Sequence, residues 1–296
     1  MLKYTIIIVS SLINKLQNTL ERTDIMPDLL QLITDKFKPC NFIEGIVLGG
    51  SRATNTASNN SDYDIGIYYN KDCIDYGILN TIAAEIDDKH RPNLICHEGE
   101  WGNWVNCGGW LTVNNFPVDL ILRDISRVKD CITQTDNGNI SFHYQTGHPH
   151  AYLNVMYRGE LSVSKILFAK NNDFIQLKHH AEYYPDTLQK ALISFAMFEA
   201  NFSCMLAQKH IGNDDLYYIN GHIFRSISSL NQVLFALNRV YCLNEKKATL
   251  RINTFSKVPP NYHARINQIL QLKTDDISQS LYLLEQLCRE VENMTK

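Results

Sequence analysis

Residues 48–69 read LGGSRATNTASNNSDYDIGIYY. Two glycines and a serine end a run of strand-type residues, and two aspartates flank Tyr63 at the start of the next such run. Because successive side chains of a β-strand point to opposite faces, Asp62 and Asp64 share one face. The stretch therefore predicts a strand, a tight polar turn, a spacer and a second strand that carries two carboxylates aimed the same way.

The turn has the residue types of a phosphate-binding loop. Gly49 and Gly50 allow a backbone to approach a ligand closely, since neither has a side chain. Ser51 is predicted to begin a helix whose free N–H groups favour an anion such as phosphate.

The two aspartates indicate a metal site. Like charges so close together repel, and a divalent cation with oxygen ligands is the usual remedy. A third acid, Asp119, lies inside the apolar run FPVDLIL, where an unpaired carboxylate would be costly. Three carboxylates beside a phosphate loop indicate metal-assisted phosphoryl or nucleotidyl transfer.

In this order, the motif resembles the polymerase β-like nucleotidyltransferase superfamily: a hydrophobic strand, Gly49-Gly50-Ser51, ten residues, Asp62-Tyr63-Asp64, and a later acid, Asp119. The resemblance covers roughly residues 40–130. An α/β head followed by a helical half is also similar to the bacterial antibiotic nucleotidyltransferases, which act on aminoglycosides and lincosamides.

The resemblance implies a mechanism. Two Mg²⁺ ions would be held by Asp62, Asp64 and, for one of them, Asp119. An acceptor hydroxyl would attack the α-phosphorus of ATP or another NTP, and pyrophosphate would leave. Asp119 would help to deprotonate that hydroxyl.

The resemblance also implies binding roles. Ser51 and the Gly49–Gly50 backbone would hold the β- and γ-phosphates, and Arg52 would neutralise them further. In the small-molecule enzymes the helical domain contributes substrate contacts and sometimes a glutamate base. Glu199 is the candidate here, and its alternative is a salt bridge to a neighbouring helix.

Two further groups are candidates for ligand contacts. His148 and His150 lie where the two halves of the chain join, either in a ligand cleft or in an ordered linker. Trp101, Trp104 and Trp110 could stack on an adenine or a sugar ring, but aromatic residues near strands more often pack against one another.

Composition limits the function further. The chain has 296 residues, 45% of them hydrophobic, and 28 Lys and Arg against 31 Asp and Glu give a formal charge of -3. This balance offers no broad basic surface, so a nucleic-acid substrate is not expected. Eight scattered cysteines favour free thiols in the cytoplasm over a disulfide framework. No membrane association is expected.

The fold class predicted is α+β, a mixed-sheet nucleotidyltransferase domain followed by an antiparallel helical bundle. The predicted domains are a helical extension at 1–25, the α/β domain at 26–145 and the helical substrate-binding domain at 146–296. Strands are expected at 42–50, 63–69, 92–98, 108–115 and 116–124, with a helix at 75–88. Long helices are expected at 185–210, 215–241, 262–272 and 275–294.

Three functions follow, in order of preference. The first is Mg²⁺-dependent transfer of an NMP, AMP before others, to a hydroxyl of a small molecule such as an aminoglycoside or lincosamide. The second is a toxin- or antitoxin-type nucleotidyltransferase that modifies a protein or tRNA. The third is a non-catalytic nucleotide-binding module, against which the presence of all three carboxylates speaks. The acceptor, the nucleobase and the oligomeric state stay open.

Overall fold

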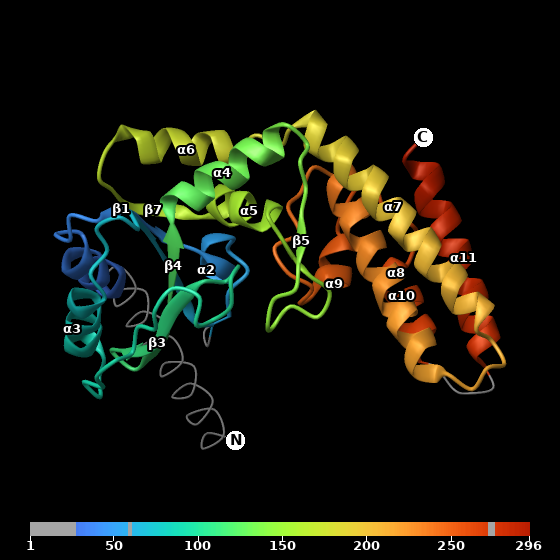
Figure 1. The fold of residues 1–296 in the computed structure, drawn as a ribbon, viewed down its shortest axis with the longest axis horizontal. Coiled ribbons are helices and arrows are strands. Elements are labelled where there is room, and N and C mark those ends of the chain that lie inside the picture. Colours follow the sequence, from blue (N-terminus) through green and yellow to red (C-terminus); the bar gives the residue numbers. More distant parts are fainter. Residues whose placement is uncertain (1–27, 59–60, 272–275) are drawn as a thin grey trace, which may run out of the picture. The chain divides into compact units, whose positions relative to one another are not determined.

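The computed structural model describes residues 28–58, 61–271 and 276–296. The helical extension predicted at 1–25 lies outside these residues. The described chain is α+β, with a mixed five-stranded sheet and a C-terminal set of long helices (Figure 1). The predicted fold class is therefore confirmed.

The chain forms two compact units, and each is assembled from separate segments. The first contains the described residues up to Trp101, Asn106–Ser126 and Ser164–Gln176. The second contains Gly102–Val105, Arg127–Val163 and Leu177–Lys296. The predicted domains 26–145 and 146–296 are continuous stretches of the sequence, whereas the segments of these two units alternate along it.

The first unit is built on the five-stranded sheet, whose order is β3-β4-β2-β1-β7. The strands are β1 (Ile43–Leu48), β2 (Tyr63–Tyr69), β3 (Cys107–Val113), β4 (Phe116–Asp124) and β7 (Lys165–Ala169). The pair β2–β4 is parallel, and all other neighbours are antiparallel. The predicted strands over 42–50, 63–69, 108–115 and 116–124 are present.

Alternation along the strands gives the sheet one core face and one polar face. The core face packs against the helix at residues 28–37 and against α3 (Tyr76–Ile86), and it buries Ile65, Ile67 and Leu120 completely. On the other face, Asp64 and Gly66 of β2 and Asp119 and Ile121 of β4 are only half-buried, whereas Tyr68 further along β2 is buried. Apolar burial on one face thus fixes which side chains the other face presents.

Two sequence predictions fail in this unit. Residues 92–98 were predicted as a strand but form an irregular loop, because the Asn80 side chain takes the place of a strand partner. Its Nδ2 donates to the Ile95 carbonyl at 3.0 Å, and its Oδ1 accepts from the Ile95 N–H at 2.8 Å. In contrast, β7 forms an edge strand beside β1 within a region predicted to be helical.

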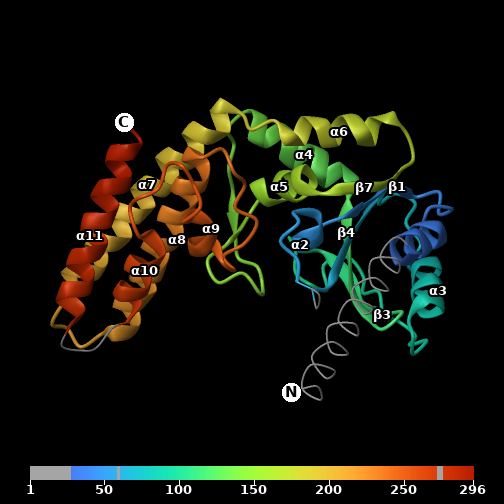
Figure 2. The same ribbon diagram turned by 180° about the vertical axis from the view of Figure 1, so that it is seen from behind.

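The second unit is mainly helical. Its helices are α5 (Val155–Val163), α7 (Asp186–Lys209), α8 (Leu216–Leu237), α9 (Ala248–Ile252), α10 (Tyr262–Leu270) and α11 (Ile277–Met294). The helices α4 (Ile125–Asp136) and α6 (Asn172–Glu182) run from the first unit into it, and β5 (Phe142–His143) pairs with β6 (Tyr152–Leu153). The long helices lie where the sequence predicted them (Figure 2).

The core of the second unit lies between α7, α8, α10 and α11. The first two are antiparallel, since Gln189 near the start of α7 donates from Nε2 to the Ala236 carbonyl near the end of α8 at 2.8 Å. Pro185 is the N-cap of α7 and so precedes the first helical residue.

The helix α7 is long and apolar enough to cross a membrane by length and composition alone, in the part of the chain that the structure describes. Core helices of globular proteins pass the same test. Ala196, Ala200 and Cys204 of α7 are buried within the helical core. In contrast, Phe195, Phe198 and Phe202 of the same helix are exposed.

Candidate active site

Two of the three predicted metal-binding acids are brought side by side by the strand register. Asp64 on β2 pairs with Asp119 on β4 in the parallel ladder, although 55 positions separate them in the chain. In-register neighbours of a sheet present their side chains on the same face. Asp62 immediately precedes β2 and is exposed, and Tyr63 between the two acids is buried on the opposite face. The predicted alternation is therefore present.

The surroundings of Asp119 disfavour its charged form. Burial, and after it the negative charges of Asp64 and Asp62, together raise the pKa of Asp119 to about 6. All three causes act in one direction, and this shift is what a cluster of carboxylates without a nearby cation produces.

This donor set fits a divalent cation, because such an ion would turn the mutual repulsion into attraction. As the side chains stand, no group of three or more His, Cys, Asp or Glu residues within 28–58, 61–271 and 276–296 is arranged to hold a metal ion. The fit therefore rests on the chemistry of the three carboxylates and on their shared face, not on a preformed cage.

The glycine turn is built around Asp64. The Gly49 N–H donates to the Asp64 carbonyl at 2.7 Å. Gly50 begins the short helix α2 (Gly50–Ala53) with φ +57, and a Cβ on it would lie 1.7 Å from Asp64 Oδ2. A glycine is thus required at position 50 both by its left-handed backbone and by the carboxylate seated against it. Ser51 is the second residue of α2.

Arg52 ties the turn to the acidic strand. Its guanidinium donates to the Ser61 carbonyl at 2.6 Å and to the Asp62 carbonyl at 3.2 Å, and it lies 3.7 Å from the centre of the Tyr63 ring. This network fixes the backbone at the point where the two aspartates begin. A phosphate contact by Arg52 remains a prediction.

A lysine that sequence reasoning missed lies beside the turn. Lys165, the first residue of β7, donates from Nζ to Asn55 Oδ1 at 3.1 Å and to the Arg52 carbonyl at 3.4 Å. It lies more than 100 residues beyond the motif, in a region predicted to be helical. No local signal in the sequence connects it to the glycine turn.

The three tryptophans separate into two environments. Trp101 and Trp110 stack on each other in the first unit, with ring centroids 4.6 Å apart and an interplanar angle of 24°. Trp104 belongs to the second unit and stacks on His143 at 3.7 Å. Packing among aromatic residues accounts for Trp104, whereas Trp110 remains 62% exposed.

Glu199, a candidate substrate residue, lies on α7 in the second unit. It forms an ion pair with Arg225 of α8 and accepts a hydrogen bond from Ser203 at 3.2 Å. Burial acts to raise the pKa of Glu199, but the hydrogen bond and charge of Arg225 outweigh burial and lower it. The structure thus contains the salt bridge to a neighbouring helix that was the alternative to a catalytic role, and that role stays a prediction.

The two candidate histidines in the same unit flank Glu245. The backbone N–H of His150 donates to Glu245 Oε1 at 2.9 Å, and His148 Nδ1 lies 3.6 Å from Glu245 Oε2. Burial and then the Arg225 charge lower the pKa of His150. These contacts with Glu245 fit the ordered linker that was the alternative to a ligand cleft. A role of either histidine in substrate binding remains a prediction.

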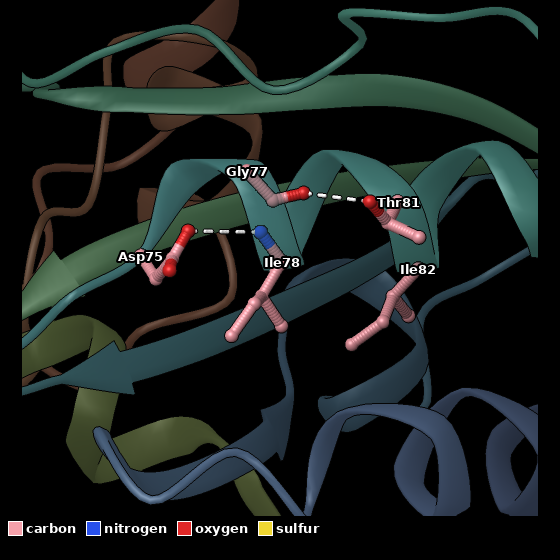
Figure 3. A pocket seen from close by; sticks show the side chains of 5 residues that line it. All are labelled: Asp75, Gly77, Ile78, Thr81 and Ile82. Carbon is pink, nitrogen blue, oxygen red and sulfur yellow. Dashed lines mark hydrogen bonds between the residues drawn. The ribbon is translucent and has the colours of Figure 1, made fainter.

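A pocket of about 370 Å³ lies on α3, away from the acidic face of the sheet (Figure 3). Its lining includes Asp75, whose carboxylate caps the helix by accepting from the Ile78 N–H at 3.0 Å, and Gly77, whose carbonyl accepts from Thr81 at 2.9 Å. Its polar groups are thus engaged within the helix, and none of the predicted site residues lines it.

Comparison with known proteins agrees with the geometry. Residues 31–96 match the family model described as Polymerase beta, Nucleotidyltransferase. No curated protein matches the sequence significantly.

Two solved structures are similar in part. One is the nucleotidyltransferase-like protein from Exiguobacterium sibiricum 255-15, with 11% identity, a TM-score of 0.47, and coverage of 91% of this chain and 78% of that one. The other is the E. coli MS115-1 CdnC:HORMA-deltaN complex, with 12% identity, a TM-score of 0.24, and coverage of 91% and 84%. Neither is close enough to carry an argument about function.

The family match includes the glycine turn and the first two acids, and it confirms the prediction that the chain is a nucleotidyltransferase.

Proposed function

We propose that the protein transfers a nucleoside monophosphate from an NTP to a hydroxyl of a small molecule. AMP is the first candidate for the transferred nucleotide. The observation that carries this proposal is the register that sets Asp64 beside Asp119, next to a glycine turn built around Asp64. A nucleotidyltransferase domain implies an NTP substrate. An aminoglycoside or a lincosamide is the first acceptor to test, because a formal charge of -3 favours a small molecule over a nucleic acid.

Asp62, Asp64 and Asp119 would hold divalent metal, two Mg²⁺ ions in the proposal, which supplies charge stabilisation to the reacting phosphates. The acceptor oxygen forms a bond to the α-phosphorus, and the bond from that phosphorus to the pyrophosphate oxygen breaks. The hydroxyl proton passes to the Asp119 carboxylate. The Gly49–Gly50 backbone and Ser51 would bind the β- and γ-phosphates.

Pyrophosphate release is the direct test. The purified protein is assayed with Mg²⁺, each of the four NTPs, and an aminoglycoside, a lincosamide, tRNA or a protein lysate as the acceptor. Asp64→Asn and Asp119→Asn should each lower the rate at least about a thousandfold, since each removes a charge that holds the metal. Asp72→Asn, an exposed acid after β2, is the matched control and should retain full activity.

The same assay with a labelled NTP decides between the three functions, because the transferred nucleotide carries its label to the acceptor. Label in a small molecule supports the proposal, and label in tRNA or in a protein supports the second function. NTP binding without pyrophosphate release from any acceptor would identify a non-catalytic module and overturn the proposal.

A further inference from the structure

The polar face of the sheet carries an ordered row of groups across four strands. Trp110 on β3 pairs with Asp119 on β4, Asp119 pairs with Asp64 on β2, and the Asp64 carbonyl accepts the N–H of Gly49 just beyond β1. Directly paired residues present their side chains on one face, with Cβ atoms about 5 Å apart. The row therefore runs from the glycine turn through two acids to a tryptophan.

Trp110 is shaped as a platform. One side of its indole is covered by Trp101, which lies nearly parallel to it, yet 62% of Trp110 stays exposed. Trp101 itself lies over Gly108, where a Cβ would be 2.6 Å from the ring. Gly108 and Trp110 are two positions apart on β3, so both lie on the polar face. A missing side chain at 108 thus makes room for the ring that supports Trp110.

The position of Trp110 in the row indicates which substrate it would meet. This step rests on the proposed function. If the phosphates lie at the glycine turn, pyrophosphate leaves toward β1, and an in-line attack brings the acceptor from the opposite side. That side is β3, where Trp110 stands next to Asp119.

We propose that Trp110, supported by Trp101, binds the acceptor, and that the acceptor presents a hydroxylated saturated ring, a sugar or a cyclitol. Such a ring has a C–H face that packs on an indole and hydroxyl groups at its edge. With Trp110 and Asp119 on adjacent strands about 5 Å apart, one six-membered ring spans the platform and places an edge hydroxyl at the Asp119 carboxylate.

Binding of small probe sugars tests this assignment without turnover. Saturation-transfer NMR is recorded on the full chain with glucosamine and with myo-inositol, and Mg²⁺-ATP binding is measured in parallel. In the wild type, saturation should reach the ring C–H protons of both probes. Trp110→Ala should weaken probe binding about tenfold and Trp110→Phe less, while Mg²⁺-ATP affinity stays within about twofold.

The control is Trp104→Phe, which removes an indole that packs on His143 in the other unit and should leave probe binding unchanged. A wild type that binds Mg²⁺-ATP but transfers no saturation to either sugar would overturn the assignment and leave the proposed function standing. Weaker ATP binding in Trp110→Ala, with sugar binding intact, would overturn it in favour of a nucleobase platform. A wild type that binds no Mg²⁺-ATP would instead count against the proposed function.

Discussion

Asp119 in the sheet and Asp136 at the end of α4 are both partly buried carboxylates, but their surroundings shift their pKa values in opposite directions. Burial and two further acids raise the pKa of Asp119 to about 6. Burial also acts to raise the pKa of Asp136, but Arg158 and His180 outweigh it and lower the pKa. The comparison separates a carboxylate that is paired with cationic side chains from a carboxylate whose charged neighbours are other acids.

Arg158 provides the strongest test of the paired region. It is completely buried and donates to Asp136 at 2.6 Å, to Thr135 at 3.1 Å and to the carbonyls of His180 and Tyr183 at 3.0 and 2.8 Å. Arg158→Ala should lower the free energy of unfolding by about 3–5 kcal/mol, because it removes a completely buried guanidinium, leaves a cavity in its place and breaks the ion pair with Asp136. Urea denaturation measures the loss.

Arg289→Ala is the matched control for that experiment. Its exposed pair with Glu285, one helical turn away, should contribute at most about 0.5 kcal/mol. A loss below about 1 kcal/mol for Arg158→Ala would show that the buried network does not stabilise this unit. The pairing of Asp136 with Arg158 would then not distinguish it from Asp119.

Gly50 tests the region arranged around Asp64. Gly50→Ala should cost about 2–3 kcal/mol of unfolding free energy, since alanine is strained at φ +57 and its Cβ would lie 1.7 Å from Asp64 Oδ2. Gly99→Ala separates the two causes, because Gly99 also has positive φ (+86) but no atom within 4 Å of the added Cβ. Equal losses for the two variants would show that Asp64 is not crowded by the turn.

Asp119 should limit stability at neutral pH. A raised pKa means that stability is fully present below the unfolded pKa, near 3.8, and is lost as the pH rises through about 6. In metal-free buffer at pH 7.5, Asp119→Asn should therefore raise the free energy of unfolding by about 1–2 kcal/mol, allowing for solvent screening of a half-exposed group. The gain should shrink as the pH is lowered toward 4.

Thermal unfolding with EDTA and with Mg²⁺ measures this effect. Added Mg²⁺ should raise the melting temperature of the wild type more than that of Asp119→Asn, because an ion that binds only the folded state stabilises it. A wild type that grows more stable between pH 4 and 7.5, relative to Asp119→Asn, would contradict the repulsion at this site.

Glu199 should give the smallest effect and the opposite pH dependence. Its partner Arg225 is 55% exposed, so Glu199→Gln should cost about 0.2–1 kcal/mol. The lowered pKa means that this contribution is present above the unfolded pKa, near 4.5, and is lost as the pH falls through the lower folded value. A double-mutant cycle with Arg225→Gln isolates the pair, and a turnover loss of about a hundredfold without destabilisation would favour the predicted catalytic role.

The elements with a local signal could be predicted from the sequence. Runs rich in Val, Ile and Tyr predicted β1 to β4, and alternation along β2 predicted that Asp62 and Asp64 share one face. Asp119 was found as the one acid in an apolar run. Helical periodicity gave α3, α7, α8, α10 and α11. Once the strands were assigned, the fold class followed, because strands and helices occur in separate runs.

What failed depends on partners distant in the chain. The five residues of β7 become a strand by pairing with β1, more than 100 positions away. Residues 92–98 look like a strand, but the Asn80 side chain satisfies the Ile95 backbone. The hydrogen bonds of Arg52 could not be predicted either, because its guanidinium meets the Ser61 and Asp62 carbonyls only when the turn is folded.

The late position of β7 governs how the sheet can be completed during synthesis. A ribosome releases β1 to β4 before the chain has reached Lys165, and much of the helical unit's first half, residues 127–163, is made in between. A fragment that stops at Ser126 would leave the outer edge of β1 unpaired and open to pairing with another molecule. The two units are therefore not consecutive segments of the chain, and a single cut in the sequence cannot yield both of them whole.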